Sequence, residues 1–391
     1  MLVPRPRRTA PGVGAFEITP STRIAADPAS ESVRLYLQQT LRGSTGLPVR
    51  DALDDTAPGA GTIALRVADD PSLPAGSTTP EGDRSESFRL TVTPDGVDVI
   101  GGSPAGVFYG VQALLQLLPP DVYRRGRVAT GPWSVPAVVV EDAPAFAWRG
   151  VMLDVARHFR TKHEVMRVVD QLAAHRLNRL HFHLTEDQGW RIEIRKYPRL
   201  TEVGSWRRES QVGAHVPGPD GTLVVAGFDG RPHGGYYTQD DVREIVAYAA
   251  DRFVTVVPEI ETPGHVRAAL AAYPSLGVTG EPVEVWTEWG IADDVLNAED
   301  ATIDFFKDVL DEVIALFPSG YIGIGGDECP KVQWETDPRT QERIRELGLQ
   351  DEEQLQAWII GQLAAHVESH GRRAFGWDEI CLLYTSPSPR D

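Results

Sequence analysis

Two neighbouring carboxylates, Asp327 and Glu328, follow the short apolar segment Tyr321–Ile324 and a pair of glycines. An apolar run of this kind is typical of a buried strand, so the two acids stand where a strand ends. Three further apolar segments end in polar side chains, namely Arg157 and His158, Glu186 and Asp187, and Glu261 and His265. Because barrel enzymes carry their catalytic groups at the carboxyl ends of strands, the pattern predicts one active site.

Close carboxylates suit the hydrolysis of glycosidic bonds, which needs a proton donor for the leaving oxygen and stabilisation of a cationic sugar ring. We expect Glu328 to donate the proton, because Asp327 beside it would raise the pKa of Glu328. Gly325 and Gly326 relax the backbone, so both side chains are expected to reach the cleft. The alternative is a surface loop with two solvated acids.

Arg157 and Trp377 are candidate substrate-binding residues at the ends of the first and fifth expected strands. The planar guanidinium of Arg157 matches two neighbouring sugar hydroxyls, and Trp377 offers an apolar wall. A structural salt bridge for Arg157 and a core position for Trp377 are the alternatives.

His265 is expected to pair with Glu186 or Asp187 and to link them to Glu328, unless it is only a capping or packing residue. A metal-dependent hydrolase using His181, His183 and His265 is a further alternative, because two histidines on one strand face can bind a metal. The fifth expected strand ends in Trp-Asp-Glu without another histidine. We therefore expect no metal and no cofactor.

The chain has 391 residues, 41% of them hydrophobic, which is enough for more than one domain. Its formal net charge of -18 argues against nucleic acid and against anionic membranes as partners. No apolar run approaches the roughly 20 residues of a membrane span, and none near the N-terminus reaches the roughly 7 residues of a signal peptide. A cytoplasmic location is the expectation, with secretion left open, and nothing indicates an oligomeric state.

Residues 15–142, after an N-terminal segment 1–14, are predicted to form an α+β domain without catalytic residues. Ser87–Thr93 and Val97–Ile100 flank a turn and predict a β-hairpin, and the spacing of apolar residues over 105–118 predicts a helix.

Residues 146–380 alternate between apolar strands and helices, which predicts an α/β fold with parallel strands, either a barrel or an open doubly wound sheet. We expect strands at 150–155, 179–184, 254–260, 321–324 and 373–377, and helices at 162–176, 239–251, 264–272, 301–316 and 351–369. Residues 213–235 are expected to form a long loop over the barrel mouth.

A (β/α)8 barrel needs eight strands, and only about five are found. Residues 381–391 look unlike the preceding sequence and are expected to be a non-native tail, with the coding sequence broken near Ile380. An authentic short tail is the alternative.

The segments Arg149–Phe159, His183–Trp190, Pro258–His265 and Gly325–Glu328 together resemble the strand-end motifs of glycoside hydrolase family 20, the β-N-acetylhexosaminidases. The N-terminal region is similar to the small domain that precedes the barrel in this family. The resemblance implies an exo-glycosidase that removes terminal β-linked N-acetylglucosamine or N-acetylgalactosamine. It implies a retaining mechanism in which the substrate's own acetamido oxygen attacks the anomeric carbon and forms an oxazolinium ion.

By this resemblance, Asp327 orients the acetamido group and Glu328 protonates the leaving oxygen and later activates water. Arg157 grips sugar hydroxyls, Trp377 forms one wall of the acetamido pocket, and Glu186 with His265 forms a supporting dyad. The sequence departs from the pattern at Glu186 and Glu261, where many members carry Asp, and at Gly323, where many carry His. A sugar-binding fragment without catalytic activity is the remaining alternative.

Overall fold

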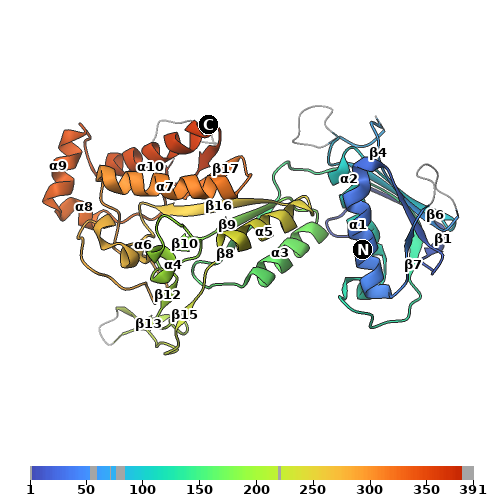
Figure 1. Cartoon of the computed structure of the whole chain (residues 1–391), viewed down its shortest axis with the longest axis horizontal. Coiled ribbons are helices and arrows are strands. Elements are labelled where there is room, and N and C mark those ends of the chain that lie inside the picture. Colours follow the sequence, from blue (N-terminus) through green and yellow to red (C-terminus); the bar gives the residue numbers. More distant parts are fainter. Residues whose placement is uncertain (1, 53–59, 71, 76–83, 219–221, 381–391) are drawn as a thin grey trace. The chain divides into compact units, whose positions relative to one another are not determined.

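The computed structural model describes residues 2–52, 60–70, 72–75, 84–218 and 222–380, and it divides into two compact units (Figure 1). The N-terminal unit holds the residues up to Gly150 together with Val169–Asn178 and Asp251–Val254. The barrel unit holds Val151–Val168, Arg179–Ala250 and the residues from Thr255 onward. The expected tail, 381–391, lies outside the described residues.

The N-terminal unit is built on a seven-stranded sheet. Its strands, in spatial order, are β1 (Arg8–Glu17), β7 (Ser134–Asp142), β5 (Phe88–Val92), β6 (Gly96–Gly101), β4 (Thr62–Val67), β2 (Arg23–Ala26) and β3 (Arg50–Asp51). β5 and β6 pair antiparallel, which confirms the predicted hairpin. β1 begins at Arg8, so the sheet includes part of the segment 1–14 that the sequence sets apart.

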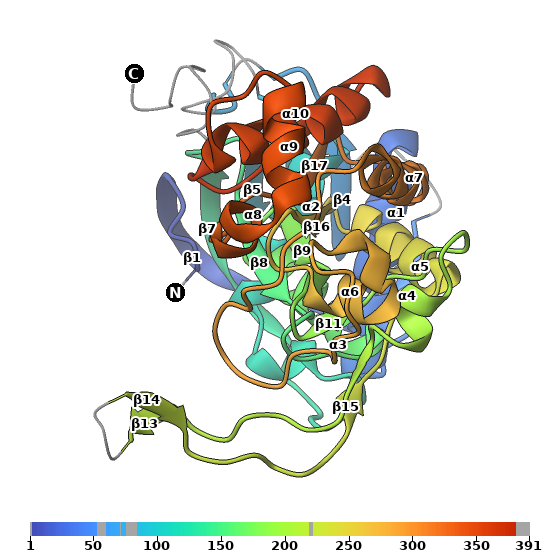
Figure 2. The same ribbon diagram turned by 90° about the vertical axis from the view of Figure 1, so that its left-hand side faces the viewer.

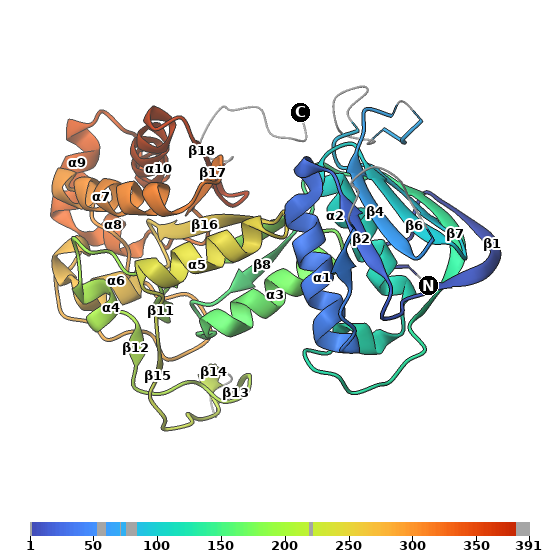
Figure 3. The same ribbon diagram turned by 45° about the vertical axis from the view of Figure 1, so that its right-hand side comes forward.

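Two helices, α1 (Glu31–Thr45) and α2 (Pro104–Leu117), lie on the same face of this sheet (Figure 3). α2 begins where the Ser103 hydroxyl accepts the N–H of Ala105, with proline at the first helical position. Alternate residues of β6, such as Val97 and Val99, are fully buried with the helices in one hydrophobic core. This confirms the predicted helix and explains why the unit folds around its own core.

The barrel unit contains a five-stranded sheet whose spatial order repeats the order along the chain. The strands are β8 (Gly150–Asp154), β9 (Arg179–His183), β16 (Thr255–Thr262), β17 (Tyr321–Gly325) and β18 (Arg373–Phe375). β9, β16, β17 and β18 pair parallel in this succession. In a doubly wound sheet the order reverses part-way, whereas in a barrel each new strand is added on the same side. The strand order therefore favours the barrel over the doubly wound sheet.

Helices separate the strands as the sequence predicts. They are α3 (Lys162–Ala174), α5 (Gln239–Ala250), α7 (Asp300–Leu316) and α10 (Glu352–Ser369), with shorter helices α4 (Arg199–Glu202), α6 (Arg267–Ala272), α8 (Val332–Thr336) and α9 (Pro338–Glu346) in the connections. α7 and α10 pack together, and α10 also contacts β17 and β18 (Figure 1). None of the helices in the described ranges combines the length and hydrophobicity that crossing a bilayer requires.

The expectation of one long loop over 213–235 is wrong. β13 (His215–Pro217) and β14 (Leu223–Val225) form an antiparallel pair that extends from the barrel strands (Figure 2), and β15 (His233–Gly234) pairs with β12 (Trp206–Arg207). Strands of two or three residues are too short to show the period-2 alternation on which strand prediction depends.

Candidate active site

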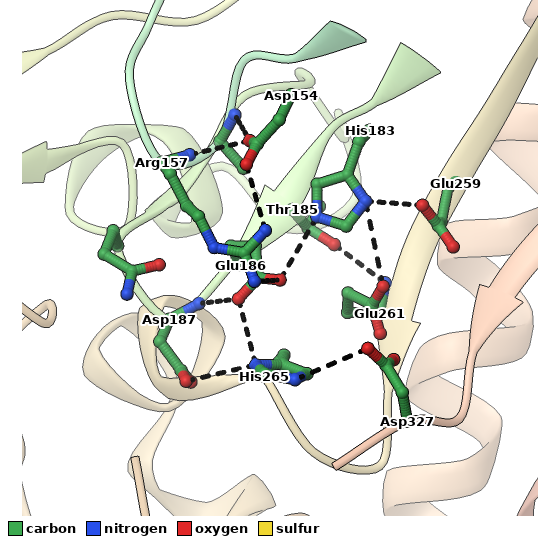
Figure 4. Close-up of polar contacts among 12 residues, drawn as sticks. Asp154, Arg157, His183, Thr185, Glu186, Asp187, Glu259, Glu261, His265 and Asp327 are labelled. Atoms are coloured by element: carbon green, nitrogen blue, oxygen red, sulfur yellow. Dashed lines mark hydrogen bonds and ion pairs between the residues drawn. The ribbon is translucent and has the colours of Figure 1, made fainter. Parts of the chain in front are cut away.

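Four neighbouring parallel strands end at one edge of the barrel sheet, and each is followed by polar side chains (Figure 4). β8 ends at Asp154, β9 at His183, β16 at Thr262 and β17 at Gly325. Because the strands run in parallel, side chains that follow different strands meet at this edge. The structure thus brings together residues that lie more than 170 positions apart in the sequence.

Arg157 is positioned by the turn that follows β8. The Asp154 carboxylate accepts the backbone N–H groups of Ala156 and Arg157 at 2.9 and 3.0 Å, and its second oxygen accepts from the Arg157 guanidinium at 2.9 Å. The other end of the guanidinium pairs with Glu186 Oε1 at 2.6 Å. The Arg157 side chain remains 25% exposed, so a ligand can reach it.

Glu186 and His265 lie next to each other, as the predicted dyad requires. Glu186 Oε2 is 3.1 Å from His265 Nδ1, and Asp187 Oδ2 is 3.4 Å from the same nitrogen. Asp187 is fixed in turn by the backbone N–H groups of Arg267 and Ala292, at 3.0 and 3.1 Å. His265 is buried and has a φ of 53°, so the loop after β16 holds it in a left-handed conformation that aims its ring across the strand ends.

Asp327 and Glu328 both face the other nitrogen of His265. His265 Nε2 lies 3.7 Å from Asp327 Oδ2 and 3.4 Å from Glu328 Oε2. Positive φ angles at Gly325, Gly326 and Glu328, of 71°, 100° and 45°, turn the chain after β17. A Cβ at Gly325 would lie 1.9 Å from Glu261 Oε2, so this position accepts only glycine. The turn brings two sequential acids to one side, where a regular strand would point them apart.

Burial opposes the ionisation of Glu186, but His183, His265 and Arg157 outweigh it and lower the pKa of Glu186 to about 2. Burial likewise opposes a charge on His265, yet Asp187 and Glu186 raise the pKa of His265 to about 10. At neutral pH the dyad is therefore a carboxylate beside an imidazolium. The imidazolium carries a proton on each nitrogen and presents a positive charge to Asp327 and Glu328.

Burial raises the pKa of Asp327, and the charge on His265 acts in the opposite direction. Burial and the negative charges on Glu259, Asp327 and Glu186 also raise the pKa of Glu261 well above its usual value. The raised pKa favours the protonated form of Glu261, which is packed behind Asp327. The expected effect of Asp327 on the pKa of Glu328 stays a prediction.

Trp377 follows β18, and its backbone N–H donates to the Gly325 carbonyl at 3.1 Å. The Trp377 ring therefore stands beside the strand end that carries Asp327, and its centroid is 6.0 Å from that of His181. A second aromatic residue, Trp289, was missed from the sequence. Its ring, 66% exposed, lies 5.5 Å from the Arg157 guanidinium. In the sequence, Trp289 stands in a segment without helical or strand periodicity, so the only signal was the presence of a Trp.

The three histidines of the metal alternative do not share one position. His181 and His183 both contact Glu259, and the distance from His181 Nε2 to Glu259 Oε2 is 2.8 Å. His265 instead faces Glu186 and Asp187. Both histidines of β9 contact the same Glu259 oxygen, and an N–H group donated by each ring satisfies these contacts without a metal ion.

We expect hydrolysis to be unchanged in excess EDTA. A loss of activity that added Zn²⁺ restores would contradict this.

Cys329 directly follows the two acids, and we expect it to have no catalytic role. The residue is buried, and burial raises the pKa of its thiol to about 12, so the reactive thiolate is scarce at neutral pH. We expect Cys329→Ala to retain activity within about twofold of the parent, because the thiol only packs. A rate loss beyond tenfold with an unchanged melting temperature would contradict this interpretation.

Comparison with known proteins decides the family. The model "Glycosyl hydrolase family 20, catalytic domain" matches residues 146–390, and the model "Glycosyl hydrolase family 20, domain 2" matches residues 1–143. The chain belongs to glycosyl hydrolase family 20. The resemblance read from the strand-end motifs is thereby confirmed, as is a barrel fold preceded by a smaller domain.

Relatives within family 20 are similar over almost the whole chain. A β-hexosaminidase of Porphyromonas gingivalis is 41% identical over 389 residues, which are 99% of this chain and 46% of the relative. A β-hexosaminidase of Vibrio furnissii is 35% identical over 381 residues, 97% of this chain and 57% of the relative. The chain thus spans about half the length of these curated relatives. A solved mutant β-hexosaminidase of Streptomyces plicatus, in complex with the product GlcNAc, superposes with a TM-score of 0.78 at 34% identity, covering 98% of this chain and 67% of that one.

Proposed function

We propose that the protein is an exo-β-N-acetylhexosaminidase. It removes terminal β-linked N-acetylglucosamine or N-acetylgalactosamine, and its partner is an amino-sugar glycoside. The observation that carries the proposal is the convergence of Asp327 and Glu328 on one buried imidazolium, His265, which Glu186 holds from the opposite side at 3.1 Å. Membership of family 20 and the β-hexosaminidase relatives support the same activity.

Each residue has a role that its position supports. Glu328, whose side chain is 48% exposed, is accessible for protonating the leaving oxygen and for activating water afterwards. Asp327, 19% exposed, lies deeper, where a carboxylate can accept the acetamido N–H and balance the positive charge of the oxazolinium ion. The acetamido oxygen is the nucleophile, so one acid suffices for proton transfer.

Arg157 and Trp377 bind the terminal sugar in this proposal. Arg157 is held by Asp154 and Glu186, so its guanidinium is pre-oriented before a substrate arrives. Trp377 is tied through its backbone to Gly325 and supplies the wall of the acetamido pocket. Glu186 and His265 are the supporting dyad that keeps the two acids in place.

Hydrolysis of 4-nitrophenyl N-acetyl-β-D-glucosaminide by the purified chain tests the proposal. We expect release of 4-nitrophenol, retention of the β configuration in the first product formed, and inhibition by a thiazoline analogue of the oxazolinium ion. A chain that binds the thiazoline but releases no 4-nitrophenol would instead support the alternative of a sugar-binding fragment.

A further inference from the structure

Glu259 is a fully buried carboxylate that the proposed function does not use. It lies on β16, in register with His183 of β9. Glu259 Oε2 contacts His181 Nε2 at 2.8 Å. The same oxygen contacts His183 Nδ1, as Figure 4 shows. His181 and His183 stand two residues apart and so lie on the same face of β9. One carboxylate oxygen thus holds two histidines of the neighbouring strand.

Gly323 on β17 makes the room that Glu259 occupies. The two residues are paired across the parallel strands β16 and β17. A Cβ at Gly323 would lie 2.9 Å from Cβ and Cγ of Glu259 and 2.9 Å from the Phe375 ring, closer than carbon atoms can approach. Because Gly323 has no side chain, β17 supplies no polar partner at this position, and the polar partners of Glu259 come from β9.

His183 connects Glu259 to the dyad. Its Nε2 lies 3.2 Å from Glu186 Oε1, the same oxygen that pairs with Arg157 at 2.6 Å. The opposite oxygen of Glu186 pairs with His265 at 3.1 Å. Together with the backbone N–H of Asp187, which donates to Glu186 Oε2 at 3.1 Å, four donors hold Glu186, and Glu259 orients one of them. Except for Arg157, the side chains in this series of contacts are at most 2% exposed.

We infer that Glu259 is a positioning residue: it fixes His183, and through His183 it sets the place of Glu186 between Arg157 and His265. Three carboxyl groups face His183, namely Glu259, Glu186 and Glu261, the last at 3.8 Å from Nδ1. Burial would lower the pKa of His183, but Glu186 and Glu259 raise it to about 9. His183 is then a buried cation between two anions, and it loses its proton more readily when Glu259 loses its charge.

Glu259→Gln tests this inference in two ways that need no turnover. In ¹⁵N-histidine NMR titrations, with His183 assigned by its absence in His183→Gln, we expect the pKa of His183 to fall by about 1–3 units. In a crystal structure of Glu259→Gln, we expect the 2.6 Å contact between Arg157 and Glu186 to be lost or lengthened. Glu342→Gln is the control for the change of net charge, because Glu342 is an exposed acid on α9 that pairs with Arg345, and it should leave the His183 pKa unchanged.

Turnover supplies a third readout, and it rests on the proposed function. We expect Glu259→Gln to lower kcat/KM by up to about 10²-fold, the effect of misplacing groups that bind and activate the substrate. Glu86→Gln is the control for loss of an ion pair elsewhere, since Glu86 pairs with Arg149 at 2.9 Å in the N-terminal unit, and it should retain full activity.

An unchanged His183 pKa together with an intact Arg157–Glu186 contact in Glu259→Gln would overturn the inference. If Glu259→Gln fails to fold, His183→Gln replaces it, because removing the intermediate cation should displace Glu186 in the same way. An unmoved Glu186 in that variant would overturn the inference equally. A parent chain without turnover would contradict the proposed function, while the titration and the crystal structure would still decide the role of Glu259.

Discussion

Replacing Glu328 by Gln is expected to lower kcat for phenyl N-acetyl-β-D-glucosaminide by about 10²–10⁴-fold, the usual contribution of a general acid–base residue. The amide keeps the shape of the side chain but neither donates an acidic proton to the leaving oxygen nor removes one from water. The loss should be smallest for aryl glycosides with acidic leaving phenols, whose departure needs little protonation. A series of substituted phenyl glycosides measures this dependence directly.

Glu342→Gln serves as the control for Glu328→Gln. Glu342 is an exposed acid on α9 that pairs with Arg345, so its neutralisation changes the net charge equally without touching the strand ends. We expect unchanged kinetics for this variant. A Glu328→Gln enzyme that turns over at the parent rate would contradict the assignment of the proton donor.

Asp327→Asn is expected to lower kcat by about 10²–10³-fold, the range seen when one preorganised electrostatic group is removed from a transition state. The acetamido group then loses the carboxylate that orients it and balances its positive charge. In contrast to Glu328→Gln, this loss should be similar for good and poor leaving groups, because Asp327 does not protonate the leaving oxygen.

The thiazoline analogue provides the second readout for Asp327→Asn. We expect its affinity to fall with the rate, since both depend on the same carboxylate. A variant that loses rate but binds the thiazoline as tightly as the parent would contradict the role given to Asp327 and would place its effect elsewhere in the cycle.

The long parallel strands were predictable because both of their faces are covered. Such strands read as continuous apolar runs, and the runs at 321–324 and 179–184 match β17 and β9 to within one residue. The polar residues that follow the runs were therefore also found, among them Arg157, Glu186, His265 and Asp327. For these long strands it was their sequential order in space, which distinguishes a barrel from a doubly wound sheet, that required the structure.

The role of Glu259 could not be predicted, because it depends on strand register. In the sequence, Glu259 is one of two acids in Pro258–Glu261, and nothing indicates which of them is paired with His183 across the two strands. The pairing of Glu259 with His183 on one side and Gly323 on the other decides that question. Trp289 was missed for a different reason: it reaches Arg157 through irregular backbone whose path no periodic pattern describes.

The central claim is that the acetamido oxygen of the substrate is the nucleophile, oriented by Asp327. The most direct test compares kcat/KM for aryl glycosides whose N-acetyl group carries zero, one, two or three fluorine atoms. Each fluorine withdraws electrons from the acetamido oxygen and makes it a weaker nucleophile. We predict a steep, progressive fall in kcat/KM along the series. A rate that stays flat across the series would contradict participation by the substrate and would call for a nucleophile supplied by the protein.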